Sequence, residues 1–590
     1  MSRRLPLAYL TVLALATAVP SAGEDPPDAR EPSWRGAGLA PSWRRSLPES
    51  EALRIPTPIT RDEEVERVTL KEAIGIALEN NPGIAAQRLE PTRQGAGVLQ
   101  AGATFDPTLS GELTHRNSIT PNASALAGTR TLVTDDRSAN LHLFKTFRTG
   151  TTATVDFLND RLDTNPRFQQ LRPEYQAALN LSLVQPLLRN FGWDFSYLIV
   201  RVAEQVADAA VYQYQAQVAD FVQQVIEAYW NVVRTRENLE VQRESKTLAD
   251  RTVHENEARV RVGLLPPVAV LEAEADAKSR EEQVIQADND LAVARQLLAQ
   301  TAFYRPADTF VPRTLEPADE VVPEDVTVDI EHGLSTALSN RPEIQASARG
   351  ILVQQLNERI ATNGLLPRLD VVGSYGVNGL SGTNRAVSLT TVAFSPTDLG
   401  GGRCVPLGSG QGFICKVVLN AASPFAGSAS EAYRRLESND FRSYSFGLQF
   451  QMPLSNALAR SELTQSRITR SQAELNHRQL LSNVTLEVRK SAADVTSARQ
   501  RIDTTRVARA LAEENLRNQE KRHEVGMATT KDLLDFQTRL TSARAAEVQA
   551  KVDYAIAVAS WLRAQGRLLA NYQVVVEQPG RRGTPWFARF

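Results

Sequence analysis

Two long stretches of this sequence contain neither glycine nor proline, and they limit the folds that the chain can adopt. Residues 193–262 give 70 such positions, and residues 454–525 give 72. Both stretches are rich in Ala, Glu, Gln, Arg and Leu, which are good helix formers. At about 1.5 Å per residue, each helix would be roughly 100 Å long, which is far longer than a globular domain is wide. We therefore expect rod-like helices.

A shorter helical stretch follows each long one. Residues 268–305 and 527–565 give 38 and 39 further positions without Gly or Pro. The apolar positions of the long stretches follow a mixed three-, four- and seven-residue spacing, and many of them are Ala. Small residues permit close helix approach but bury little area each, so such helices need neighbours on two sides. This pattern favours a helical barrel over a two-stranded coiled coil.

The chain also repeats itself. Residues 70–84 match residues 330–344, and the shared letters lie 260 positions apart. Two further matches occur at spacings of 267 and 263, pairing residues 185–187 with 452–454 and residues 262–264 with 525–527. Three matches at nearly constant spacing indicate two copies of one unit.

The N-terminus reads as a secretory signal that is removed. Residues 1–4 are basic, residues 5–19 are mostly apolar, and small residues follow Pro20. The apolar run is too short to span a bilayer about 30 Å thick. We divide the chain into a signal peptide, an extended lead segment, two structural repeats and a C-terminal tail, over residues 1–22, 23–67, 68–325, 326–569 and 570–590.

Shorter segments before each long helix alternate between apolar and small or polar residues, as strands do. The clearest runs from residue 441 to 453, and similar runs cover residues 105–113, 179–183 and 369–377. Residues 141–157 read as a further hairpin that turns at residues 148–150. One apolar face fits a transmembrane β-barrel, and a soluble sandwich is the alternative.

The number of strands has a consequence for assembly. Four strands, or six with the additional hairpin, are fewer than the roughly eight that close a barrel. An open sheet edge in lipid leaves backbone groups without hydrogen bonds, at a cost of several kcal/mol each. If these strands lie in a membrane, several chains must share one barrel, so the sequence predicts a homo-oligomer.

Charge and motifs exclude several other functions. Lys and Arg number 66 against 68 Asp and Glu, so the chain as a whole is not a strongly basic nucleic-acid binder. The sequence holds no glycine-rich phosphate loop, zinc signature or nucleophile elbow. We therefore expect no enzyme activity, no cofactor and no metal.

Two copies of a short helix, strands, a long helix and a medium helix behind a signal peptide resemble the TolC-like outer-membrane efflux protein family. The resemblance covers roughly residues 68–569, and its most specific parts are the paired Leu-x(7)-Leu-x-Asn-x-Pro-x-Ile stretches. It implies a mainly helical fold with a membrane β-barrel. In this family a trimer shares a 12-stranded barrel in the outer membrane, which continues into an α-helical barrel across the periplasm.

The resemblance also implies a function and partners. Members are exit ducts of tripartite efflux pumps or type I secretion systems, and they dock to a periplasmic adaptor (membrane fusion) protein and an inner-membrane transporter. Their Val-Gly-Leu turns contact the adaptor. Here those turns correspond to Val262, Gly263 and Leu264 in the first repeat and to Val525, Gly526 and Met527 in the second.

A second set of residues corresponds to the family's periplasmic entrance. Asp532 and Asp535 align with an acidic pair whose ring narrows that entrance, and residues three apart share a helix face. The Tyr and Arg that help to lock the entrance of other members align with His523 and Ala528, and a matching Asp aligns with Ala269. We therefore expect an acidic ring without the usual lock.

Cys404 and Cys415 lie in a Gly- and Ser-rich segment, about residues 378–440, which the barrel topology places outside the cell. Ten residues separate them and the location is oxidising, so we expect a disulfide. A metal pair is disfavoured because no His or further Cys lies nearby.

Two other classes of function stay open at this point. The long helices would also suit a secreted periplasmic coiled-coil scaffold or adaptor that never enters a membrane. The external segment with its two cysteines would suit an outer-membrane receptor or adhesin. The cargo cannot be read from the sequence.

Overall fold

The computed structural model describes residues 66–123, 128–166, 169–302, 315–322, 325–385, 387–393, 403–406, 413–419 and 423–576. The predicted signal peptide, nearly all of the lead segment and the end of the C-terminal tail lie outside these ranges. None of the helices in them is both long and apolar enough to cross a membrane.

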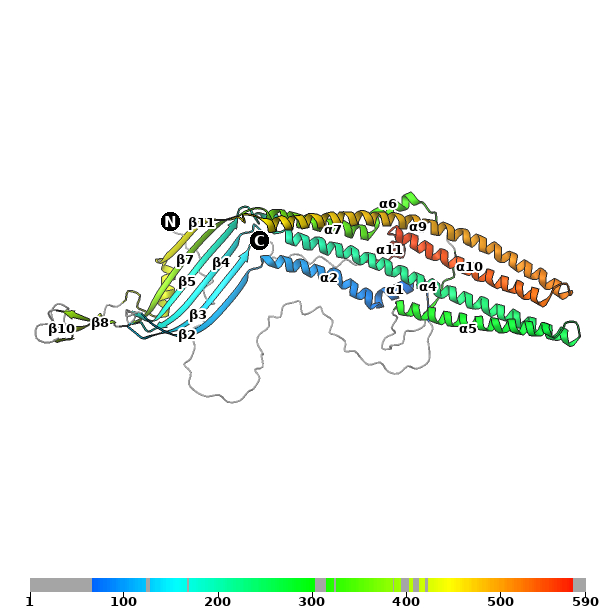
Figure 1. Ribbon diagram of the computed structural model, residues 1–590, viewed down its shortest axis with the longest axis horizontal. Coiled ribbons are helices and arrows are strands. Elements are labelled where there is room, and N and C mark those ends of the chain that lie inside the picture. Colours follow the sequence, from blue (N-terminus) through cyan, green and yellow to red (C-terminus); the bar gives the residue numbers. More distant parts are fainter. Residues whose placement is uncertain are drawn as a thin grey trace, which may run out of the picture. The chain divides into compact units, whose positions relative to one another are not determined.

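The two repeats are built from corresponding helices (Figure 1). The first contains α1 (Leu70–Asn80), α2 (Pro82–Gly102), α3 (Trp193–Ser196), α4 (Leu198–Arg261) and α5 (Val268–Ala302). The second contains α6 (Ile330–Asn340), α7 (Pro342–Gly364), α9 (Ala457–Glu524) and α10 (Thr530–Ala564), followed by α11 (Leu568–Asn571). The predicted long and medium helices are confirmed, except that a separate short turn, α3, precedes α4.

The repeated Pro explains why each unit starts with two helices instead of one. Pro82 and Pro342 are the first residues of α2 and α7, where their missing N–H groups have no helical partner to lose. Proline disfavours helical backbone at the residue before it. Asn81 and Arg341 accordingly adopt extended backbone and end α1 and α6.

The predicted strands lie in one antiparallel sheet of six, in the order β11-β7-β5-β4-β3-β2 (Figure 1). Its strands are β2 (Thr108–Pro121), β3 (Thr131–Thr146), β4 (Thr152–Thr164), β5 (Leu171–Pro186), β7 (Arg368–Asn384) and β11 (Arg442–Gln451). The hairpin whose place the sequence left open forms β3 and β4 and separates β2 from β5. The chain thus contributes six strands, whereas a 12-stranded trimer takes four from each copy.

The register gives this sheet one apolar and one polar face. One row across all six strands is apolar and consists of Leu109, Leu143, Val155, Leu181, Tyr375 and Tyr444. The next row, on the opposite face, is polar or small and consists of Ser110, His142, Asp156, Asn180, Gly376 and Ser443. Because side chains alternate along a strand, the apolar face continues to Leu113, Phe157, Leu179 and Phe446.

The segment expected to be an external loop is more structured than the sequence suggested. Strand β7 continues to Asn384, and β8 (Val387–Ala393), β10 (Phe413–Leu419) and β9 (Arg403–Pro406) form a second antiparallel sheet. Helix α8 (Ala429–Ser438) then packs on β7. A Cβ atom on Gly379 would lie 2.0 Å from the carbonyl oxygen of Ala432, so only glycine permits this close approach.

The helices pack as two antiparallel pairs, α4 with α5 and α9 with α10 (Figure 1). Nearer to the sheet, α2, α4, α7 and α9 lie side by side in that order. The first repeat's core includes Tyr229, whose hydroxyl donates to Asp319 at 2.8 Å. This core also carries the short parallel pair of β1 (Glu66–Val68) and β6 (Leu315–Pro317). The second repeat's core includes Trp561, Tyr554 and many small residues.

Candidate entrance at the hairpin tips

The two helical hairpins end in turns of the same geometry. Gly263 and Gly526 both have a backbone φ of +76°, a conformation that residues other than glycine rarely adopt. In the first tip, Leu264 N–H donates to Arg259 O at 2.8 Å; in the second, Met527 N–H donates to Arg522 O at 2.8 Å. These bonds close a helix C-terminus in the Schellman manner. The predicted tip residues therefore form two equivalent turns.

Large apolar side chains are exposed at both tips. Val262 and Leu264 are 69% and 74% exposed, and Val525 and Met527 are 68% and 80% exposed. Such side chains beside one another on a soluble part of a protein are typical of a site that a partner covers. Each tip therefore offers a small apolar contact surface.

Asp532 and Asp535 are both exposed at the start of α10, but their surroundings differ. The Asp532 carboxylate accepts the backbone N–H of Thr529 at 3.0 Å and the Thr529 hydroxyl at 2.7 Å, which makes a capping box. These hydrogen bonds lower the pKa of Asp532. Asp535 has no hydrogen-bond or ion-pair partner among the described residues. Asp532 therefore also caps α10, a role that was not predicted although the Thr-x-x-Asp pattern of residues 529–532 indicates it.

His523, Ala528 and Ala269, which align with the residues that lock the entrance in other family members, make other contacts here. His523 is buried, and its Nδ1 lies 3.1 Å from the carbonyl oxygen of Ala528 within the same turn. Arg259 of the first hairpin donates to the carbonyl oxygen of His523 at 3.1 Å. Ala269 is buried, and its carbonyl oxygen accepts the Asn256 amide at 3.2 Å. One hydrogen bond, from Arg259 to the backbone carbonyl of His523, therefore joins the two tips.

Above the tips, a row of buried polar side chains joins the first hairpin to α10; we call it the polar seam. Asn256 donates to Thr530 at 3.3 Å, Gln537 to Thr252 at 3.1 Å, and Thr541 to Ser245 at 3.0 Å. Arg280 of α5, only 4% exposed, donates to Ser245 at 3.2 Å and to Thr538. None of these residues was among the site residues predicted from the sequence.

The polar seam is incompletely satisfied. Asn256 Oδ1 and Gln537 Oε1 are buried and have no hydrogen-bond partner. Each such acceptor costs about 1–3 kcal/mol relative to its hydrated state. A contact of this kind resists separation less than an apolar one of equal area, because water satisfies its polar atoms when it opens.

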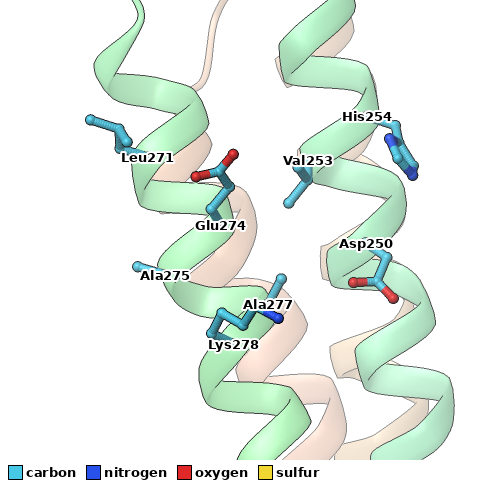
Figure 2. A pocket seen from close by; sticks show the side chains of 8 residues that line it. All are labelled: Asp250, Val253, His254, Leu271, Glu274, Ala275, Ala277 and Lys278. Carbon is cyan, nitrogen blue, oxygen red and sulfur yellow. The ribbon is translucent and has the colours of Figure 1, made fainter.

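A groove lies between α4 and α5 of the first hairpin (Figure 2). Charged side chains rim it, and some already have partners: Lys246 pairs with Asp250 at 2.8 Å, and Lys278 with Glu281 at 2.8 Å. The lining residues are Asp250, Val253, His254, Leu271, Glu274, Ala275, Ala277 and Lys278. Its mixture of charges and apolar carbons suits a polar helix better than a small molecule.

Cys404 and Cys415 lie directly opposite each other in the antiparallel pair of β9 and β10. Cross-strand partners of this kind have their Cα atoms about 4.5–5.5 Å apart, within the range that a disulfide spans. The disulfide itself stays a prediction. Across the described residues, no group of three or more His, Cys, Asp or Glu side chains is arranged to hold a metal ion.

Comparison with known proteins adds a family and a fold. The model of the family described as "Outer membrane efflux protein" matches residues 73–302 and 333–567, one segment in each repeat. No curated protein matches the sequence.

Several solved structures have the same fold. The Campylobacter jejuni CmeC outer membrane channel is 16% identical, with a TM-score of 0.57 over 88% of this chain and 94% of that one. The outer membrane protein VceC of Vibrio cholerae is 16% identical, with a TM-score of 0.56 over 84% and 96%. The open state of the Neisseria gonorrhoeae MtrE outer membrane channel is 15% identical, with a TM-score of 0.52 over 87% and 98%.

Proposed function

This chain belongs to the outer membrane efflux protein family, and we propose from that premise that three copies form one continuous exit duct. As a member, it is an outer-membrane channel at the exit of an efflux pump, it extends into the periplasm, and it is not an enzyme. A periplasmic scaffold and a receptor are therefore not its primary function.

The two-faced sheet is the single observation that best supports the shared barrel. Its apolar face carries exposed Leu113, Tyr444 and Phe446, and its opposite face is polar. An apolar face turned to lipid and a polar face turned to water are what a membrane β-barrel requires. We assign the polar face to the lumen. A trimer closes the sheet and continues below it as a ring of helices.

The hairpin tips are assigned to contact with a periplasmic adaptor, which in turn joins an inner-membrane transporter. Val262, Leu264, Val525 and Met527 supply exposed apolar contacts on turns held by glycine. The groove between α4 and α5 extends this surface away from the tip (Figure 2). The two tips have the same geometry, so a repeated adaptor helix pair can use the same contact twice per chain.

Asp535 is assigned to the entrance as the charged group that faces the pore. It is exposed and unpaired among the described residues, whereas Asp532 is engaged by Thr529. Three copies would present a ring of carboxylates from both positions, which favours cations and retards anions. The polar seam is assigned to hold the hairpins of one copy together while the entrance is closed, in place of the missing lock.

Planar-bilayer recording tests this entrance. Asp535→Asn should weaken the block by a multivalent cation added from the periplasmic side and lower cation selectivity. Asp532→Ala is a poorer test, because it also removes the helix cap. The matched control is Glu462→Asn, which changes an exposed carboxylate far from the tip on α9. If Asp535→Asn and Glu462→Asn behaved alike, the entrance assignment would be wrong.

Two further measurements test the duct and the adaptor contact. The protein should fractionate with Sarkosyl-insoluble outer membrane, and a wholly soluble periplasmic pool would contradict the duct. Val525→Ser with Met527→Ser should reduce cross-linking to an adaptor and impair export, while trimer assembly and conductance stay unchanged. Unaltered export by a trimer that carries both substitutions would contradict the tip assignment.

A further inference from the structure

Four of the six strands are each connected along the chain to one of the four helices nearest to the sheet, and two are not. Strand β2 follows α2, β5 leads to α4, β7 follows α7, and β11 leads to α9. The helices lie in the order α2-α4-α7-α9, which is the order of those four strands in the sheet. The β3–β4 hairpin lies between β2 and β5 with no helix of its own.

The turn of this hairpin meets the helical part of the chain. Phe147 N–H donates to Thr151 O at 2.8 Å to close the turn, and Gly192 N–H donates to Thr149 O at 3.2 Å. The guanidinium of Arg148 lies 4.8 Å from the centre of the Tyr197 ring, just before α4 begins. The hairpin therefore runs the full height of the sheet, from its far end to the helices.

A comparison of widths shows what the two extra strands achieve. Four packed helices take roughly 32–40 Å side by side, at about 8–10 Å each. Strands about 4.8 Å apart and tilted by about 40° each take roughly 6 Å of a barrel's circumference. Four strands would then span roughly 25 Å and six roughly 38 Å. The six-stranded sheet is therefore closer in width to the four helices below it than a four-stranded sheet would be.

We propose that three copies of this chain close an 18-stranded barrel, three times the six strands of one sheet, by pairing β2 of one copy with β11 of the next. This proposal rests on the proposed trimer. It makes the outer end of the duct about as wide as the helical part. Bulky water-soluble cargo that passes the helical section would then meet no narrower barrel at the exit.

The two sheet edges are suited to this pairing. Within the described residues, no strand pairs with the outer edge of β2 or of β11. Because each of the six strands is antiparallel to its neighbour, β2 and β11 run in opposite directions. Pairing β2 of one copy with β11 of the next therefore continues the antiparallel pattern. Leu113 of β2 and Phe446 of β11 are exposed on the apolar face. Long apolar edges left unpaired would aggregate, and a second copy covers both at once.

The strand count also meets the general rule for such proteins. Bacterial outer-membrane barrels have even numbers of strands, and those with about 16–18 hold an aqueous channel. Barrel diameter grows roughly in proportion to strand number. A backbone diameter of about 36 Å follows for 18 strands, against about 24 Å for 12 strands.

Two measurements on the full-length protein test the proposal. Single-particle imaging of the purified trimer in lipid nanodiscs should show 18 strands. In planar bilayers, polyethylene glycols added to the external side alone should enter the mouth up to a size set by the wider barrel. Twelve strands in the image, with β3 and β4 outside the wall, would overturn the proposal.

A deletion supplies the comparison. Removing residues 131–164 takes out β3 and β4 and leaves β2 and β5 antiparallel and able to pair, so a 12-stranded trimer should form. The largest polymer admitted from outside should fall in radius by at least about one third, because the backbone diameter falls in proportion to strand number. The control removes residues 387–419, whose described strands β8, β9 and β10 form a separate sheet, and should not lower this limit.

The outcomes separate this proposal from the proposed function. A wild-type protein that forms no conducting channel would contradict the duct itself. A conducting wild-type channel whose polymer limit is unchanged by the 131–164 deletion would contradict only the wide barrel. If the variant that lacks residues 131–164 fails to assemble, the number of strands seen in the image of the wild-type trimer still tests the wide barrel.

Discussion

The amide of Gln537 on α10 donates to the hydroxyl of Thr252 on α4 at 3.1 Å, and both residues are almost fully buried between the two hairpins. The Thr252 hydroxyl in turn donates to Leu248 O at 3.1 Å, while Gln537 Oε1 has no partner. This pair lies at the centre of the polar seam. It is therefore the place where a single substitution can test the strength of the hairpin contact.

Gln537→Glu should open the entrance. It places a carboxylate in a buried position opposite the Thr252 hydroxyl, with no cation in direct contact among the described hydrogen bonds and ion pairs, which should weaken the hairpin contact by about 3 kcal/mol. We expect a severalfold rise in single-channel conductance in planar bilayers. Gln537→Leu should be nearly neutral, since it also removes the unpaired oxygen. Gln500→Glu, at an exposed site on α9, is the matched control. Equal conductance of the Gln537→Glu and Gln500→Glu channels would argue against the seam.

Gly526→Ala should destabilise the second hairpin tip. No atom lies within 4 Å of the added Cβ, so the cost comes from φ of +76° alone and should be about 1 kcal/mol. Hydrogen exchange at the tip should therefore speed up. Gly97→Ala in α2 adds a Cβ in equally open space but in helical backbone, and it should be neutral or stabilising. Similar exchange at the tip in the two variants would exclude backbone strain as the cause.

The hairpin contact should weaken as pH rises. Burial, together with Glu255 and Glu524, raises the pKa of Glu520 above 4.5, although Arg251 and Arg517 partly oppose this. For a carboxyl whose pKa is raised by packing, the stabilisation is fully present below pH 4.5 and is lost as pH rises through the higher value.

Conductance at the proposed entrance should therefore be lower near pH 4.5 than at pH 7, and Glu520→Gln should flatten this dependence. Bilayer recording at stepped pH measures both channels. Glu462→Gln, at an exposed position on the same helix, should retain the wild-type profile. If the Glu520→Gln channel kept the wild-type pH profile, groups other than Glu520 would cause the pH dependence.

Cys404 and Cys415 should form a disulfide in the exported protein. Because they are direct cross-strand neighbours, the bond should form without displacing β9 or β10. Mass spectrometry without reductant should show a peptide pair lighter by two hydrogen atoms and resistant to alkylation. Cys404→Ser with Cys415→Ser should leave conductance unchanged, since the pair lies outside the six-stranded sheet. Free thiols in the native protein would refute the bond.

Much of the fold could be predicted because its signals are local. The absence of Gly and Pro predicts α4 and α9, and the spacing of the repeats predicts two equivalent units. The turns at Gly263 and Gly526 could be predicted from a Val-Gly pair that follows each long helix, because a left-handed residue closes a helix there. Such features depend on neighbours within a few residues.

The polar seam was missed for the opposite reason. Four buried residues of α4 follow the four- and three-residue spacing of a helix core, but three of them are polar: Ser245, Ala249, Thr252 and Asn256. In the sequence, that pattern is indistinguishable from a solvated helix face. Only the opposing side chains Thr530, Gln537 and Thr541, nearly 300 residues away, turn it into an interface.

The long helices, the two repeats and the alternation of the strands follow from the sequence alone, because backbone propensity and side-chain period act over short distances. The folded chain was needed to show that β3 and β4 lie between β2 and β5 and thereby widen the sheet to six strands. Strand pairing is set by register between distant segments. A hairpin carries the same alternation whether it lies inside a sheet or beside it.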